Sequence, residues 1–142
     1  MALAIDLARQ AAAASEVPVG AVIVRNGVVV AAERNRMREH ADPTAHAELL
    51  AIKSALSATG KARLTDCDLY VTLEPCTMCA GAIAHARLRR IYYGAPDPRS
   101  GAIDNGVRFF AHPSCHHHPE IVGGLNETEA ASLLSGFFAD RR

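Results

Sequence analysis

The chain has 142 residues, a length typical of one domain, and 49% of them are hydrophobic, which is enough for an ordinary core. Its 15 basic and 15 acidic side chains cancel, so nothing favours general affinity for DNA or other polyanions. We find no secretory signal and no apolar run long enough to cross a membrane, and therefore expect a cytoplasmic protein.

The first third of the chain predicts a helix followed by a hairpin. An Ala- and Leu-rich segment over residues 2–14 favours a helix, and Pro18 lies in the connection that follows. Two apolar runs, 19–24 and 28–32, flank Asn26-Gly27, whose residues tolerate positive φ, and this pattern predicts a β-hairpin. Neither run alternates with polar residues, so we expect both faces of each strand to be covered.

The remainder alternates between helices and strands. Asp42 and Pro43 suit the start of a helix that runs to about Thr59 and stops at Gly60, with a buried stripe of Ala45, Leu49, Ile52 and Leu56. A strand, a short helix, two strands and a closing helix follow, over residues 68–73, 75–86, 91–93, 120–122 and 127–139. This order predicts an α/β sandwich, and without a linker or repeat we expect residues 1–142 to form a single domain.

Two short motifs carry the candidate chemistry, His46-Ala47-Glu48 and Pro75-Cys76-Thr77-Met78-Cys79. One imidazole and two thiols suit a catalytic zinc with three protein ligands and an open fourth position. Cys76 and Cys79 would share one face of a helix. His46 and Glu48 point in opposite directions within a helix, so both can serve one site only at a helix end. The simplest arrangement has two helix N-termini converging on a metal held by His46, Cys76 and Cys79.

Four other interpretations of these cysteines are weaker. Disulfides are disfavoured because nothing indicates an oxidising compartment. A structural zinc normally takes four protein ligands, and no second pair at zinc-finger spacing exists. A redox Cys-x-x-Cys leaves His46 and Glu48 unexplained, and a zinc-stabilised binding module has no use for a costly carboxylate beside the metal. We therefore expect Glu48 to move protons, and Cys67 and Cys115 to be unpaired thiols.

The motifs match the H-x-E…P-C-x-x-C signature of zinc-dependent nucleobase deaminases, and the chain resembles the cytidine deaminase superfamily. Within it, nearly the whole chain is similar to the bacterial tRNA-specific adenosine deaminases, in blocks over residues 16–21, 42–48, 69–76, 78–82 and 94–97. The resemblance implies a three-layer α/β/α sandwich with a central mixed five-stranded sheet, one Zn²⁺ per subunit and a homodimer. It also implies hydrolytic deamination of the wobble adenosine to inosine in a tRNA anticodon stem-loop, expected to be that of an arginine tRNA.

The same resemblance implies residue roles. A hydroxide generated at the zinc would attack C6 of the adenine while Glu48 carries protons. Asn35 would hydrogen-bond the purine, Ala47 would offer its backbone N–H, and Asp97 would hold the ribose. The pocket would be lined by Glu16, Val17 and Pro18. Flanking nucleotides would contact Phe137, Phe138 and Arg141, although one of the two phenylalanines is expected in the core.

Some alternatives stay open on sequence alone. The same zinc chemistry would serve a deaminase of a free base or nucleoside, such as guanine or cytosine. Two arginine groups could bind phosphate or be solvated surface, Arg34, Arg36 and Arg38 and then Arg87, Arg89 and Arg90. The loop His112–His118 is expected near the substrate mouth, and a second metal site there is a weaker interpretation.

Overall fold

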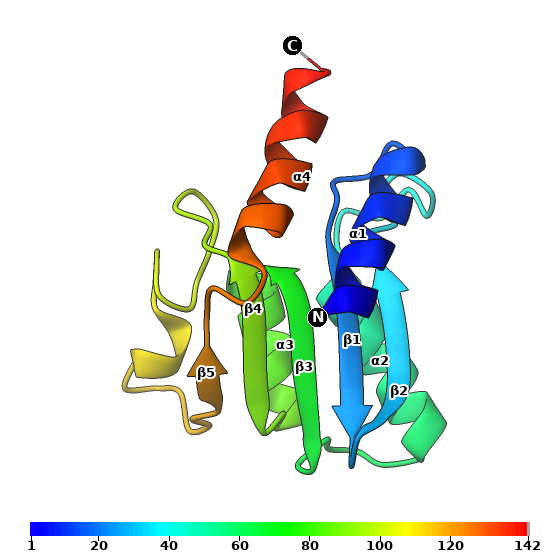
Figure 1. The fold of residues 1–142 in the computed structure, drawn as a ribbon. Helices are drawn as coiled ribbons and strands as arrows, with labels where there is room; N and C mark the ends of the chain where they lie inside the picture. Colours follow the sequence, from blue (N-terminus) through cyan, green and yellow to red (C-terminus); the bar gives the residue numbers. More distant parts are fainter. Residues whose placement is uncertain (142) are drawn as a thin grey trace.

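A five-stranded mixed sheet forms the centre of the computed structural model, which describes residues 1–141 (Figure 1). The strands are β1 (Gly20–Arg25), β2 (Val28–Arg34), β3 (Cys67–Leu73), β4 (Arg90–Ala95) and β5 (Glu120–Val122), in the order β2-β1-β3-β4-β5. β1 is antiparallel to β2 and β3, whereas β3, β4 and β5 run parallel to one another. The mixed five-stranded sheet expected from the sequence is confirmed.

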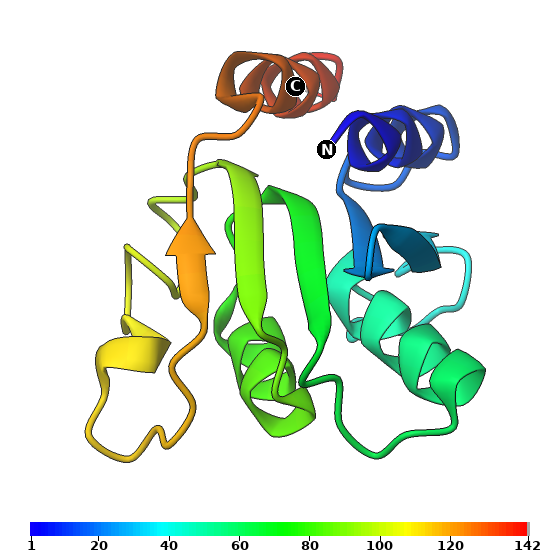
Figure 2. The same ribbon diagram turned by 60° about the horizontal axis from the view of Figure 1, so that its bottom comes forward.

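Helices cover both faces of this sheet, which gives three layers (Figure 2). α1 (Ala2–Ala13) and α4 (Glu127–Ala139) lie on one face, and α2 (Ala47–Thr59) and α3 (Thr77–Ala86) lie on the other. A short 3₁₀ helix, η1 (Phe109–Ala111), was not expected from the sequence. Over residues 1–141, none of the helices has the length and apolarity that a membrane span requires.

The main core lies between the sheet and the α2/α3 layer, where Ile23, Leu69, Ile83 and Ile91 are fully buried. A smaller cluster around Ile5 and Ala130 joins α1 and α4 to the opposite face. Gly20 shows how closely α1 approaches β1, because a Cβ there would lie 2.0 Å from the carbonyl oxygen of Ala4. Burial on both faces fixes the ends of β1 and β3, where the site is built.

The predicted β1–β2 hairpin is confirmed, but the predicted burial of both faces of its two strands is not. Asn26 and Gly27 have φ values of 50° and 76°, as the predicted turn requires. Val28 and Val29 are 63% and 48% exposed, so the expectation that both faces of β2 are covered is wrong. The reason is strand order, because β2 is an edge strand and these valines adjoin the hairpin turn.

The start of α2 differs from the prediction in a way that matters for the site. Asp42 does not cap the helix, because its Oδ1 accepts hydrogen bonds from the N–H and hydroxyl of Thr44 at 2.8 and 2.7 Å in a local turn. The helix begins four residues later than expected, at Ala47, with His46 as its N-cap residue in extended conformation. Its end at Gly60 is confirmed by a left-handed φ of 66°.

Candidate active site

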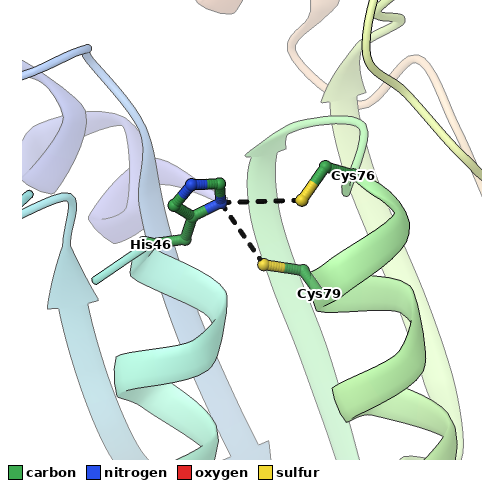
Figure 3. A group of neighbouring side chains, drawn as sticks. All are labelled: His46, Cys76 and Cys79. Atoms are coloured by element: carbon green, nitrogen blue, oxygen red, sulfur yellow. Dashed lines mark hydrogen bonds between the residues drawn. The ribbon is translucent and has the colours of Figure 1, made fainter. Parts of the chain in front are cut away.

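Two helix N-termini converge where β3 ends. His46 is the N-cap of α2 and Cys76 is the N-cap of α3, both with extended backbone, and Cys79 lies in the first turn of α3. The imidazole Nδ1 of His46 lies 3.6 Å from each cysteine sulfur (Figure 3). The convergence of two helix ends expected from the motif spacing is therefore observed.

The geometry of these three donors fits a zinc ion. The three ligand atoms lie within 4.8 Å of one another. With Zn–S of about 2.3 Å and Zn–N of about 2.05 Å, a tetrahedral site places nitrogen and sulfur about 3.6 Å apart. The observed separations of 3.6 Å match this value before any metal is added. No second group of this kind occurs among residues 1–141, so a metal site at the His112–His118 loop is not supported.

The three donors shift one another's pKa values through their mutual contacts. The hydrogen bond with the Cys79 thiol outweighs the effect of burial and, with the bond to His46, lowers the pKa of Cys76 to about 4. The same bond to Cys76 raises the pKa of Cys79 in the metal-free protein. The hydrogen bond with Cys76 also raises the pKa of His46. Because a coordinated thiol is deprotonated, a divalent cation would replace this shared proton and hold both sulfurs as thiolates.

Glu48 lies beside the triad and is only 5% exposed. Burial, which disfavours the charged carboxylate, raises the pKa of Glu48 to about 7 in the metal-free protein. Because His46 is a cap residue outside the helix and Glu48 is inside its first turn, both side chains reach the same cavity. A spacing of two residues would point the side chains of His46 and Glu48 apart within a helix, but at the helix end it brings them to the same cavity.

A cavity of about 160 Å³ contains these groups. Its wall combines two of the three candidate metal ligands, His46 and Cys76, with Glu48, Asn35 and an apolar set. Its lining residues are Val17, Val19, Asn35, Met37, His46, Glu48, Leu73, Glu74, Cys76, Asp97 and Ser100. A second hollow of about 260 Å³ shares Val17, Leu73, Asp97 and Ser100 with it and extends toward α4, where Leu134 and Phe138 line it. The first space suits a planar base, and the second adjoins its mouth.

The chain matches known proteins along its whole length. A family model described as the cytidine and deoxycytidylate deaminase zinc-binding region matches residues 1–95, which include the triad and Glu48. A tRNA-specific adenosine deaminase of Agrobacterium fabrum is 55% identical over 142 residues, covering 100% of this chain and 93% of that protein. The chain belongs to the tRNA-specific adenosine deaminases. Zinc is accordingly the cofactor of the protein, as the motifs predict.

Structural comparison agrees with this family. A structure from a study of A-to-I editing by tRNA:A34 deaminases at the wobble position has a TM-score of 0.93 at 56% identity, covering 94% of this chain and 97% of that one. A guanine deaminase from Bacillus subtilis is more distant, with a TM-score of 0.64 and 32% identity over 97% of this chain and 88% of its own. The tRNA-specific adenosine deaminases are thus nearer to this chain in both sequence and shape than that guanine deaminase.

Three of the residues expected to contact substrate have other partners. Both carboxylate oxygens of the buried Glu16 accept backbone N–H groups, from Arg38 at 3.0 Å and Glu39 at 2.9 Å. Pro18 is fully buried and does not line either hollow. The N–H of Ala47 is donated to Asn35 Oδ1 at 2.8 Å. Glu16 and Pro18 therefore line neither hollow and lie behind the residues that do. The N–H of Ala47 orients the side chain of Asn35 and is not free to bind substrate.

The remaining candidates from the sequence divide by exposure. Val17 and Asp97 line both hollows, and Phe138 is 48% exposed and lines the outer one. Phe137 is buried at 8% exposure, which confirms that one of the two phenylalanines packs inside. The guanidinium of Arg141 lies 3.5 Å from the ring centroid of Phe137, so this arginine holds the last turn of α4 as well as facing solvent.

Several cavity residues were not identified from the sequence. Nothing in the sequence distinguished Leu73 and Met37 as cavity residues, because apolar residues at the end of a strand or in a loop look like ordinary core residues. Ser100 and Arg99 were missed because loop 97–105 carries no pattern that places it over the site. Glu74 lies in the block of residues 69–76 that resembles the family, but no role was predicted for it. A charged residue between a buried strand and a candidate metal ligand is unusual, and Glu74 is buried.

None of the arginines of the two basic groups and none of the loop histidines lines the cavity, although the first group alternates in sequence with Asn35 and Met37, which do. Arg36 pairs with Glu39 and Glu33, and Arg89 and Arg90 pair with acids at the start of the parallel strands β3–β5, the opposite end of the sheet from the site. The histidine loop packs against the C-terminal end of α3, where His117 bonds the carbonyl of Leu88. The expectation that this loop lies at the substrate mouth is wrong for this chain. None of the four cysteines forms a disulfide, and Cys67 and Cys115 are unpaired, as expected.

Proposed function

We propose that this protein deaminates the wobble adenosine of a tRNA anticodon to inosine by a zinc-dependent hydrolysis that consumes water and releases ammonia. The observation that carries the proposal is a base-sized cavity lined by a buried carboxylate, Glu48, and by His46 and Cys76 of a zinc-type triad whose third member, Cys79, lies directly beside them. Similarity over the whole chain to a tRNA-specific adenosine deaminase supplies the substrate class. The arginine tRNA remains part of the proposal as the expected substrate.

In this proposal His46, Cys76 and Cys79 hold the zinc. When bound, zinc supplies the Lewis acidity that makes a water nucleophilic near neutral pH. Glu48 would take one proton of the attacking water and give it to the ring nitrogen of the base. It would then take the second proton, from the hydroxyl group added at C6, and give it to the amino group, which leaves as ammonia while the C6 oxygen becomes a carbonyl. Its position in the same cavity wall as His46 and Cys76 supports this role.

Asn35 is suited to recognise the ring of a purine. Because the backbone N–H of Ala47 can only donate, the side-chain atom facing it is Oδ1, and Nδ2 is left toward the cavity as a donor. We infer that this amide donates to an unprotonated ring nitrogen of adenine. Ala47 then contributes by fixing the orientation of Asn35.

The RNA on either side of the base would follow the outer hollow toward α4. Asp97 would contact the ribose of the target nucleotide, and Val17 would contact the base at the mouth. Unstacked RNA bases stack on exposed aromatic rings and on arginine guanidinium groups. This supports the exposed Phe138 and Arg141 as contacts for the flanking nucleotides. Phe137 would support this surface from within.

We further propose that residues 1–142 act as a single catalytic domain in the cytoplasm and assemble as a homodimer. An apolar hollow of about 270 Å³ between α3 and the loop at Val107 supplies a surface for a second copy. Analytical ultracentrifugation at micromolar concentration is expected to give a mass near twice 15.1 kDa, and a monomer alone would contradict the dimer.

The activity is tested by incubating purified protein with an arginine tRNA anticodon stem-loop carrying adenosine at the wobble position. Nucleoside mass spectrometry is expected to show inosine at that position, because the cavity accepts one flipped base. Stem-loops of other tRNAs, free guanine and free cytosine run in parallel. If ammonia is released from a free base while every stem-loop stays unchanged, the substrate is a small molecule and the proposed RNA substrate is wrong.

A further inference from the structure

One buried carboxylate in the cavity wall has no place in the chemistry above. Glu74 follows β3 and precedes the zinc-binding Cys76 by two residues, and its side chain is only 2% exposed. Among the described residues, none of the recorded ion pairs involves it. A charge at such a position requires other compensation, since unpaired buried charges are strongly disfavoured.

That compensation comes entirely from one loop. Oε1 of Glu74 accepts the N–H of Asp97 at 3.0 Å and the side-chain amide of Asn105 at 2.7 Å. Oε2 accepts the N–H groups of Ile103, Asp104 and Asn105 at 3.0, 3.0 and 3.1 Å. Five donors from residues 97–105 therefore converge on one carboxylate, and hydrogen bonds to an ionised acceptor are the stronger kind.

The loop packs tightly around the Glu74 carboxylate. A Cβ at Gly101 would lie 2.5 Å from the carboxyl carbon of Glu74, so only glycine allows the loop to wrap around the side chain. The N–H of Ala102 is donated to the carbonyl of Pro75 at 2.9 Å, and Gly101 forms a bridge with Cys76. The loop is thereby joined to the turn that carries a zinc ligand.

The loop held in this way forms part of the substrate pocket. Asp97 and Ser100 line the base cavity, and Arg99 lines the outer hollow with them. Oδ1 of Asp97 accepts the N–H groups of Arg99 and Ser100 at 3.0 Å each, so the segment moves as one unit. Apart from Glu74, this loop is held by the backbone contacts at Gly101 and Ala102 and by the hydroxyl of Tyr93, which donates to the carboxylate of Asp104.

We propose that Glu74 is a positioning residue for deamination, which fixes loop 97–105 as one wall of the substrate pocket. The role rests on the proposed function, because this wall borders the flipped base and its 2′-hydroxyl-bearing neighbours. Glu74 itself transfers no proton, since all its bonds are to groups of the loop. It acts through Asp97 and Ser100 on how tightly the RNA is held.

The test replaces Glu74 with glutamine. A glutamine has one acceptor oxygen in place of two, so in either orientation its Nε2 faces loop donors, either those of residues 103–105 or the N–H of Asp97 and the amide of Asn105. The loop is therefore held less tightly, while the shape and volume of the side chain stay nearly constant. Amide hydrogen exchange of residues 103–105 is expected to rise about tenfold or more in the zinc-loaded protein. The KM for the wobble-adenosine stem-loop is expected to rise about tenfold, with kcat changed less than about threefold and zinc content unchanged.

The matched control is Asp68→Asn, which alters another buried acid at the opposite end of β3. It should leave exchange at residues 103–105 and the KM unchanged. Should Glu74→Gln fail to fold, Gly101→Ala perturbs the same contact and must raise the same exchange and KM. Unchanged exchange, or loss of zinc and kcat at constant KM, would overturn the proposal. Exchange is measured without substrate, so a wild-type protein inactive on every tRNA would count against the proposed function alone.

Discussion

Replacement of Glu48 by glutamine is expected to lower kcat for deamination by about 100- to 10,000-fold, the range lost when a positioned proton-transfer group is removed. An amide cannot take the proton of the attacking water. The other ionisable groups of the cavity are engaged elsewhere. His46 and Cys76 are the proposed zinc ligands, Glu74 accepts five loop donors, and Asp97 accepts the N–H groups of Arg99 and Ser100. No described group of the cavity is therefore placed to substitute for Glu48.

The measurement separates chemistry from binding. Single-turnover inosine formation gives the chemical rate, metal analysis gives the zinc content, and fluorescence anisotropy gives the affinity for the stem-loop. We expect the last two to remain near wild type, since glutamine keeps the shape of the side chain. Asp68→Asn provides a buried-acid control with full activity expected. Undiminished turnover in Glu48→Gln would remove the assigned role.

The metal-binding group was predictable because its members are local. Each lies at or next to a helix start, so a spacing of two or three residues determines where its side chain points. The exact start of α2 was not predictable, because Asp42 can cap a helix or close its own turn, and its hydrogen bonds with Thr44 show that the turn is formed. The error left the site unaffected, because His46 still stands at a helix end.

Residues contributed by long connections were much harder to assign. Glu16 occupies a conspicuous place in its motif block, yet its carboxylate binds the backbone of a loop more than twenty residues away. Loop 97–105 is held at the cavity largely by the five donors that meet Glu74, a contact that spans 23 to 31 residues. Periodicity and spacing describe neighbours along the chain, and these contacts are set by tertiary packing. The same limit explains Val28 and Val29, whose exposure depends on strand order.

Replacement of Cys79 by alanine is expected to reduce zinc to below about a tenth of an equivalent per chain after dialysis, and to abolish inosine formation. Two ligands cannot hold the ion as three do, and even outer hydrogen-bond partners of a ligand contribute about 10- to 100-fold to metal affinity. The thermal stability gained when zinc is added to metal-free protein, about 4 kcal/mol at a thousandfold excess over Kd, should disappear as well. Metal analysis and calorimetry with and without zinc measure both effects.

The chain offers a closely matched control in Cys67, which is also fully buried and free. Cys67→Ala removes the same atom from the core of β3, far from the donors of the metal site, so it carries the packing cost of a lost sulfur without the loss of a ligand. We expect this variant to bind one zinc, to keep its zinc-dependent stabilisation and to form inosine. If Cys79→Ala also retained zinc and turnover, the triad would not be the zinc site, since the described residues contain no second group able to hold the ion.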